Sequence, residues 1–401
     1  MQRTMIFRRF LIGLMALLLL GIAAMAIDDG RFWLRYATRL PAIMGLADKG
    51  GANAIPDTRA VIAGRPGKPL RRCAPSPAMA QALGRADAYL TARKTDAFLV
   101  WHDGCLVFEH YGKGDAGTPR AAGAMAKSLM AIVAGRMMQE GMLSGLDQPV
   151  ATHVAEWRGD SRRAIRYRDL LGMHAGLAWY HQTSSPFGDF QRIIIGSDYA
   201  PRALALPRVA RPGQLYDYSA WTYDVLGIAL ARAGGKPYEV LASDLVAKPL
   251  GLGDARIYVD RPGGTVHGNC CLFNRADDWV RLGAFLAGEI RRPTMLPAAY
   301  IKAMQRGYPD QPNYGLGLWL GTPFSPRREV ASAHNPYPTP VRSVIDQSEP
   351  FAAPDVLTFE GVTQNKTWIV PLRDLVIVRL GGAPQDWDDA LVPNLLLRSI
   401  G

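Results

Sequence analysis

The sequence predicts an α+β protein whose antiparallel sheet is built from both ends of the chain and flanked by helices. Two apolar runs, 97–101 and 105–109, are joined through Asp103-Gly104, a combination typical of a β-hairpin. Apolar, β-branched runs typical of strands return only near the C-terminus. Helical patterns fill the interval, so we expect one sheet with a mostly helical region inserted into it.

The chain divides into three parts. Residues 1–27 are interpreted as a signal peptide or membrane anchor, and 28–75, which mix glycines, prolines and aromatic residues, as a lead-in or linker segment. The folded domain is expected at 76–401, with a helical subdomain at about 124–290. The expected elements are, in order, a helix at 77–93, the hairpin at 97–109, helices at 124–142, 167–171, 219–233 and 274–289, and strands at 314–321, 366–371 and 374–382.

The composition is that of an ordinary globular protein. Of the 401 residues, 48% are hydrophobic and 20% are charged, which is enough apolar material for one large domain or two interleaved ones. The net charge of +11 suits nucleic acid or an anionic membrane surface, but the basic residues are scattered and no dense Lys/Arg run alternates with aromatic residues. We therefore expect no nucleic-acid partner.

The N-terminal segment predicts export. Three arginines among the first nine residues precede 18 uncharged residues, 10–27. The small-x-small sequence at 24–26 favours cleavage, whereas the length of the apolar run favours retention as a membrane anchor. Since the positive-inside rule places the rest of the chain outside the cytoplasm in both cases, we expect a periplasmic protein or one anchored to the inner membrane and facing the periplasm.

The four cysteines would then meet an oxidising compartment. One bridge from Cys73 to Cys105, or from Cys73 to the Cys270/Cys271 pair, is compatible with the sequence, which does not choose between them. No cysteine or histidine spacing matches a zinc site, and the seven histidines are dispersed. We expect neither a metal nor an organic cofactor.

The stretch "AAGAMAKSLM", residues 121–130, resembles the start of a catalytic helix whose nucleophile is missing. Ala124 stands three residues before Lys127, where an S-x-x-K hydrolase has its serine, and residues three apart share one face of a helix. Ser128 is not a shifted nucleophile, because adjacent helix residues point about 100° apart. The tetrapeptide is short, and an alanine-rich helix with a solvated lysine is the alternative.

Further blocks of sequence resemble the serine β-lactamase-like superfamily, which includes class C β-lactamases, 6-aminohexanoate-dimer hydrolases and esterases. They follow the family's order over about residues 75–400, and the resemblance implies a β-lactamase/transpeptidase-like fold. It also implies that Tyr218 acts with Lys127 as the general base. The blocks are "AFLVWHDGCLVFEHYGKG", "MAKSLMAIVAGRMMQEGML", "YRDLLGMHAGLAW", "PGQLYDYSAWTYDVLGIALARAGG", "FNRADDWVRLGAFLAGE", "YGLGLWL" and "WIVPLRDLVIVRLGG".

The third motif of the superfamily, a lysine or histidine followed by a hydroxyl residue and glycine, falls by position on residues 359–361. Only Gly361 is kept, and the absent lysine argues against β-lactamase activity. The resemblance implies that Glu360 and Gly361 contact the substrate, with an exposed strand residue as the alternative for Glu360. It also implies an oxyanion hole made by the backbone N–H groups of Ala124 and Val362.

The resemblance further places His174, Trp179 and Tyr180 along the substrate cleft, and ordinary core packing is the alternative for the two aromatic residues. The expected substrate is a small ester or amide whose identity the sequence does not reveal.

A methyl group cannot attack a carbonyl, and loss of such a nucleophile typically costs on the order of a millionfold in rate. We therefore expect a serine hydrolase of this superfamily that is inactive as written. Ala124 is then an engineered replacement, or the chain is a natural pseudoenzyme that binds a peptide or amide ligand; the retained Lys127 and Tyr218 favour the first. A structural protein of the membrane surface is a third reading.

Overall fold

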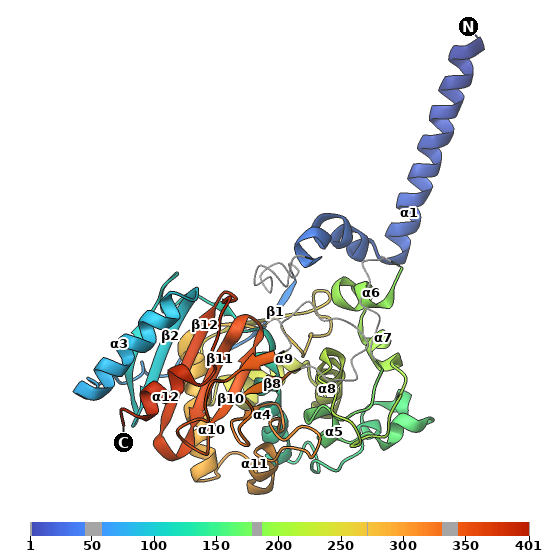
Figure 1. Ribbon diagram of the computed structural model, residues 1–401. Coiled ribbons are helices and arrows are strands. Elements are labelled where there is room, and N and C mark those ends of the chain that lie inside the picture. The colour runs from blue at the N-terminus through green and yellow to red at the C-terminus, as the bar shows by residue number, and fades with distance from the viewer. Residues whose placement is uncertain (1, 45–57, 179–186, 271, 331–343, 401) are drawn as a thin grey trace.

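The computed structural model describes residues 2–44, 58–178, 187–270, 272–330 and 344–400. Its main feature is a six-stranded antiparallel sheet in the order β3-β2-β12-β11-β10-β7. Because β12 pairs with β2, the two ends of the domain meet in the middle of this sheet, and the predicted α+β class is confirmed (Figure 1). The strands are β2 (Thr95–His102), β3 (Cys105–His110), β7 (Trp319–Leu320), β10 (Leu357–Gly361), β11 (Asn365–Val370) and β12 (Leu375–Gly381).

The β2–β3 hairpin forms where the sequence predicts it. Asp103 and Gly104 have positive φ angles of 47° and 74°, as in the type I′ turn that suits the twist of paired strands. The hairpin is tied to the preceding segment by a Cys73–Cys105 disulfide, one of the two pairings that the sequence left open.

Helices cover both faces of the main sheet. On one face, α3 (Pro77–Thr91) and α12 (Leu391–Leu397) pack against Phe98 of β2. On the other, α10 (Ala276–Arg291) shares a core with Leu99, the next residue of β2. This alternation is the two-residue repeat of a strand, and it buries the sheet on both sides.

The inserted region is mostly helical, as predicted, and in Figure 1 α5 and α8 lie to one side of the main sheet. Its helical elements are η2 (Gly123–Met125), α4 (Ala126–Gln139), η3 (Val150–Thr152), η4 (Ala155–Trp157), η5 (Ser161–Ala164), α5 (Tyr167–Leu171), α6 (Asp189–Ile195), α7 (Ala200–Ala205), α8 (Ala220–Gly234), α9 (Tyr238–Ala242) and the π-helical turn η6 (Ser243–Ala247). The short elements after α10 are α11 (Ala298–Met304), β8 (Arg327–Glu329), β9 (Val344–Asp346), η7 (Val362–Gln364) and η8 (Pro371–Arg373).

A second antiparallel sheet, in the order β1-β5-β6-β4, was not predicted. Its strands are β1 (Arg59–Ile62), β4 (Arg120–Ala121), β5 (Ala255–Tyr258) and β6 (Leu272–Asn274). β1 comes from the segment interpreted as a lead-in, so that part of 28–75 belongs to the folded domain.

Two predicted elements differ from the structure. The helix predicted from residue 124 opens with the 3₁₀ turn η2, and α4 begins at Ala126. The strand predicted at 314–321 is a strand only at β7, because the chain turns back at Gly317, whose φ is 73°, and Tyr314 forms an isolated antiparallel bridge with Trp319. The other predicted helices and closing strands are confirmed with small shifts at their ends.

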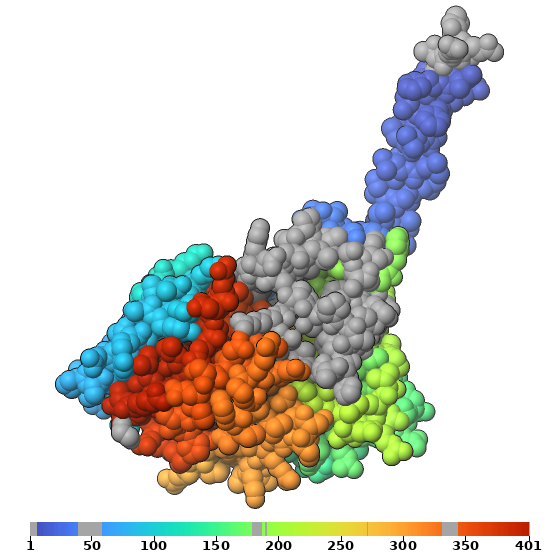
Figure 2. Space-filling view, in the orientation of Figure 1, coloured from blue at the N-terminus to red at the C-terminus, as the bar shows by residue number. Residues whose placement is uncertain are grey.

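The N-terminal helix α1 (Gln2–Met44) is broken at Asp29, where φ is −161° and ψ is 83°. From residue 6 to residue 28 nearly all of its side chains are exposed, and this part projects from the rest of the molecule (Figure 2). By length and composition, α1 is the one helix among the described residues that is suited to crossing a membrane, over Ile6–Thr38. This finding is compatible with a signal peptide or with an anchor.

Candidate active site

Ala124 lies in the tight turn η2 that leads into α4, and this turn packs against the end of β10. Gly123 has a φ of 59°, and a Cβ added to it would lie 2.8 Å from Val362 Cγ1 and 3.0 Å from Val362 N. A Cβ added to Gly361 would lie 2.2 Å from the carbonyl oxygen of Ala122. Both glycines are therefore required by the close approach of the two backbones. This approach brings the predicted oxyanion-hole residues, Ala124 and Val362, from distant parts of the sequence into adjacent segments.

Lys127 occupies the first turn of α4, and its side chain is only 4% exposed. Its Nζ donates a hydrogen bond to the carbonyl oxygen of Asn269 at 2.7 Å. Burial lowers the pKa of Lys127 to about 7, against the opposing effect of the Asp224 carboxylate. Near neutral pH a large fraction of this amine is therefore uncharged and able to accept a proton.

Tyr218 immediately precedes the N-cap of α8 and lies beside Lys127. The centre of its ring is 5.0 Å from Lys127 Nζ, and the ring packs edge-on against Tyr314 and at a tilt against Trp319. Burial, together with the negative charge of Glu360, raises the pKa of the Tyr218 phenol well above 10. The structure thus brings together the lysine and the tyrosine that the sequence paired, with a neutral phenol next to a readily deprotonated amine.

Behind Lys127 lies a carboxylate that the sequence analysis missed. Asp224 is fully buried, and its Oδ1 and Oδ2 accept hydrogen bonds from Asn269 Nδ2 at 2.9 and 3.0 Å. The backbone N–H of Asn269 donates to the same carboxylate at 3.2 Å. Asp224 thereby fixes the residue whose carbonyl receives the Lys127 amine. Burial raises the pKa of Asp224 to about 7. A single acidic residue inside the apolar helix α8 was the available signal.

His267 completes this buried group. Its Nδ1 lies 3.9 Å from Asp224 Oδ2, and its ring is stacked between Tyr199 and Tyr258, with ring centres 4.0 and 4.4 Å away. Burial lowers the pKa of His267 to about 3, with a further contribution from Arg35. This imidazole is therefore neutral at physiological pH, so Lys127 is the group next to Asp224 that changes charge near neutrality.

Ser128 points away from Lys127. Its Oγ is buried and donates to the carbonyl oxygen of Gly317 at 2.7 Å. The structure agrees with the argument from helix geometry that this serine is not a shifted nucleophile.

Glu360 lies in a buried ion-pair cluster. Its Oε2 is 2.7 Å from Arg328 Nη2 and 2.8 Å from Lys366 Nζ, and Asp389 completes the cluster at 2.6 Å from Lys366 Nζ. Burial acts to raise the pKa of Glu360, but the two cations lower it to about 2. The alternative that Glu360 is an exposed strand residue is wrong, since the residue is 8% exposed. The Arg328 guanidinium also lies over the Trp319 ring at 4.2 Å, so the cluster supports the wall on which Tyr218 packs.

His174 does not line a cleft, contrary to expectation. It is 0% exposed, its Nε2 lies 3.0 Å from Asp310 Oδ1, and its ring stacks on Tyr308 with ring centres 3.8 Å apart. These contacts explain its burial, because they satisfy the ring nitrogen inside the core. Trp179 and Tyr180, predicted beside it, lie outside the described residues. Within the described ranges, no three His, Cys, Asp or Glu side chains are grouped as a metal ion would require.

The fold, with Lys127 and Tyr218 side by side, agrees with the class of protein that the sequence resembles, the β-lactamase-like serine hydrolases. A family model described as Beta-lactamase matches residues 85–386, and the chain belongs to this family. The resemblance inferred from the sequence blocks is confirmed. No protein of curated function matches the chain in sequence at a significant level.

Solved structures show the same fold at low sequence identity. A protein assigned provisionally as a 6-aminohexanoate-dimer hydrolase from Bacillus anthracis has 15% identity and a TM-score of 0.61, with 86% of this chain and 89% of that chain covered. EstCE1, a hydrolase with promiscuous acyltransferase activity, has 17% identity and a TM-score of 0.59, with coverage of 80% and 98%. A class C β-lactamase mutant has 14% identity and a TM-score of 0.56, with coverage of 80% and 96%. At these identities the similarity shows the fold alone.

Proposed function

We propose that this site is built to hydrolyse a small ester or amide through an acyl-enzyme, and that Ala124 leaves the present chain without its nucleophile. The observation that carries the proposal is the burial of Lys127 beside Tyr218, one helical turn after position 124. Burying an amine costs free energy, so a buried lysine indicates a functional role. The lowered pKa of Lys127 is what a general base requires.

In a chain with serine at position 124, the hydroxyl proton passes to the neutral Lys127 amine as the oxygen attacks the substrate carbonyl carbon. The backbone N–H groups of residue 124 and Val362 hold the oxyanion that forms. Tyr218 then gives a proton to the leaving alcohol or amine and recovers one from the Lys127 ammonium. A water molecule repeats these transfers, releases the acid and restores the serine.

In the present chain the same groups surround a methyl, so we expect binding without turnover. An engineered Ala124 would preserve the shape of the site and retain bound substrate. The second candidate is a natural pseudoenzyme that binds a peptide or amide ligand, and it is supported by Ala124 itself. The intact Lys127 environment, with its Asn269 and Asp224 partners, favours the first.

The test compares the present chain with its Ala124→Ser variant on a panel of p-nitrophenyl esters, with nitrocefin alongside. We expect ester hydrolysis only from Ala124→Ser, with an increase of several orders of magnitude over the present chain. The matched control is the double variant Ala124→Ser/Ser128→Ala, which should keep that activity because Ser128 bonds to Gly317 and not to Lys127. Hydrolysis by the unaltered chain would refute the assignment of position 124. So would loss of activity when Ser128→Ala is added to Ala124→Ser.

We also propose that the protein is exported, with its folded domain on the periplasmic side of the inner membrane. The three arginines before the apolar part of α1 support this orientation.

A further inference from the structure

The break in α1 separates two parts with different surroundings. Residues 10–27 carry no charge, and the segment faces away from the domain. After the break, α1 turns and lies across the top of the domain as oriented in Figure 1. Asp29 starts this second part as its N-cap, since its Oδ1 accepts the backbone N–H of Phe32 at 2.9 Å. We refer to residues 30–38 as the juxtamembrane arm.

The arm is docked by side chains that are fully removed from solvent. Phe32 is 0% exposed and lies in an apolar cluster with Ile195, the last residue of α6. Arg35 is 2% exposed, and its Nη1 donates to the carbonyl oxygens of Ile195, Gly196 and Asp260 at 3.0, 3.2 and 2.8 Å. A buried guanidinium requires such acceptors, and these come from segments 160 to 225 residues away in sequence. The arm is thus part of the tertiary structure of the domain.

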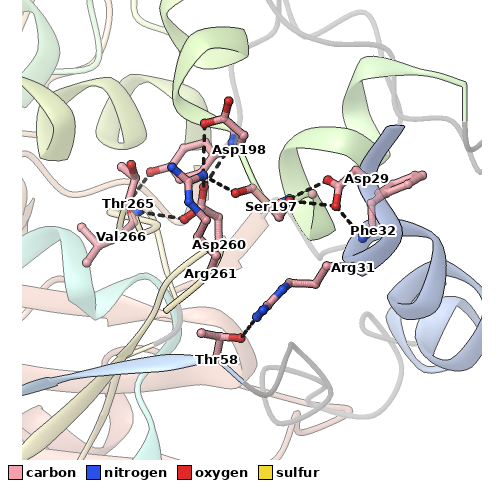
Figure 3. Close-up of polar contacts among 12 residues, drawn as sticks. Asp29, Arg31, Phe32, Thr58, Ser197, Asp198, Asp260, Arg261, Thr265 and Val266 are labelled. Carbon is pink, nitrogen blue, oxygen red and sulfur yellow. Dashed lines mark hydrogen bonds and ion pairs between the residues drawn. The ribbon is translucent and has the colours of Figure 1, made fainter. Parts of the chain in front are cut away.

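The break itself is also held by the domain. Asp29 Oδ2 accepts the backbone N–H of Ser197 at 2.9 Å, and Ser197 Oγ donates to Asp29 Oδ1 at 2.7 Å, as Figure 3 shows. The preceding residue, Asp28, forms a 2.7 Å ion pair with Arg192 and accepts a hydrogen bond from Trp33 Nε1. The Asp29 carboxylate therefore caps the arm and binds the loop after α6, and the Asp28 carboxylate binds α6 itself.

On the other side of the break, residues 10–27 match a lipid bilayer. Eighteen helical residues extend about 27 Å, close to the roughly 30 Å of a hydrocarbon core. Arginines flank the N-terminal end, and Asp28 and Asp29 mark the other. Aromatic rings, which favour membrane interfaces, gather where the helix leaves the domain, and Phe187 stacks edge-on against Trp33 there. Phe187 is 83% exposed and Leu34 on the arm is 65% exposed, so two large apolar side chains face outward at this point.

From these contacts we infer that residues 1–27 stay on the mature protein as a membrane anchor and that the juxtamembrane arm clamps the domain onto the bilayer in one orientation. Leu34 and Phe187 then insert at the lipid headgroup level. The helix runs without a break through the small-x-small sequence at 24–26 up to Asp28 and Asp29, which are tied to the domain, and this continuity supports retention. This inference is independent of the residue at position 124.

Hydrogen bonds connect the arm to the segment whose backbone binds Lys127. Arg35 bonds to the backbone of Asp260, and the Asp260 carboxylate accepts the backbone N–H groups of Thr265 at 2.8 Å and Tyr199 at 3.3 Å. The chain runs on from Thr265 to Asn269, whose carbonyl receives Lys127 (Figure 3 shows the Asp260 end). A fixed orientation of the domain on the membrane is therefore also a fixed orientation of its site.

Retention is tested on the full chain expressed with its own N-terminus. We expect a protein that resists extraction by alkaline carbonate and has the intact mass of the whole 401-residue chain, 43.8 kDa before disulfide formation. A mature protein that begins at Ile27 and is recovered in the soluble fraction would overturn the anchor.

The clamp is tested by amide hydrogen exchange of the protein in lipid nanodiscs. We expect Asp29→Ala to speed exchange roughly tenfold both in the arm and at 193–198, because it removes a helix cap and the Ser197 contacts together. Leu34→Ala, on the same arm but exposed, should leave both segments unchanged. Ser197→Ala provides a milder second variant that should affect the same two segments. If exchange at 193–198 does not respond to Asp29→Ala or Ser197→Ala, the clamp is refuted.

Seating on the bilayer is tested with a single fluorescent label at Leu34→Cys, compared with Leu372→Cys on the β11–β12 turn. Cys73, Cys105 and Cys270 are all disulfide-bonded, which suits selective labelling. Leu34 and Leu372 have similar exposure, 65% and 72%. Spin-labelled lipids should quench the label at 34 and spare that at 372. Equal quenching of both, or of neither, would contradict the proposed orientation.

Discussion

The Asp224→Asn substitution in the Ala124→Ser background tests how the environment of Lys127 is built. Burial is the main reason why the pKa of Lys127 is lowered to about 7. The Asp224 carboxylate opposes this effect, because it favours the charged form of the lysine. Lys127 must be uncharged to act as a base, so activity should rise with pH as its ammonium deprotonates. Removing the negative charge lowers the pKa of Lys127 further. The acid limb of the pH–rate profile should therefore move to lower pH.

The size of both effects follows from the contacts. Loss of a nearby opposite charge shifts a pKa by about one unit or more. Because the pKa of Asp224 is itself about 7, its charge is only partly present along the acid limb, and we expect this limb to move down by at most about one pH unit. Asn269 donates two side-chain hydrogen bonds to the two oxygens of Asp224, and an asparagine there offers only one acceptor oxygen. One buried donor is left unpaired at a cost of about 1–3 kcal/mol. If the unpaired donor shifts Asn269, whose carbonyl binds Lys127, the lysine is displaced and kcat falls on the order of tenfold.

The assay is kcat and kcat/KM for a p-nitrophenyl ester between pH 5 and pH 9. The matched control is Asp278→Asn in the same background. Asp278 is also buried, with a pKa raised to about 6 by burial, but it accepts the backbone N–H of Gly253 and has no contact with Asn269. Asp278→Asn should lower thermal stability and leave the acid limb in place. An acid limb that stays fixed or moves to higher pH in Asp224→Asn would refute the proposed role of this carboxylate.

Two further predictions concern the turn at position 124 and the buried ion pairs. Gly123→Ala should cost about 1–3 kcal/mol of stability and abolish esterase activity in the Ala124→Ser background, because an added Cβ meets Val362 at a positive φ; a fully active variant would show that the two backbones need not approach closely. Glu360→Gln should lower the free energy of unfolding by about 3 kcal/mol in urea titrations at pH 7, since it leaves Arg328 and Lys366 short of a buried partner. The pKa of Glu360 is lowered from 4.5 to about 2, so its stabilising contribution is complete above pH 4.5 and declines as the pH falls toward 2. An unfolding midpoint that is the same in both chains at pH 7 would contradict this reading of the cluster.

Local signals in the sequence predicted a large part of the fold. The Asp103-Gly104 turn predicted the hairpin because its two positive φ angles are a local property of those residue types. The second sheet was missed since its strands are two to four residues long and join partners far apart in sequence, such as Arg59 and Tyr258. So few residues carry no usable hydrophobic period.

The candidate site divides in the same way. Lys127 and Tyr218 were found through spacing and family motifs, which fix the position of a residue on an element. Neither motif reveals what surrounds a side chain. His174 was therefore placed along the cleft although Tyr308 and Asp310 enclose it. The Arg328 partner of Glu360 and the Asn269 partner of Lys127 were missed for a related reason, because each lies in a segment outside the motif blocks.

The central claim is that position 124 is the nucleophile position of an acyl-transfer site served by Lys127 and Tyr218. The most direct measurement is peptide mapping by mass spectrometry after treatment with a fluorophosphonate ester that traps activated serines. The account predicts one covalent adduct, on residue 124 of the Ala124→Ser variant, and none on the unaltered chain. An adduct on Ser128, or labelling of the unaltered chain at any serine, would contradict it.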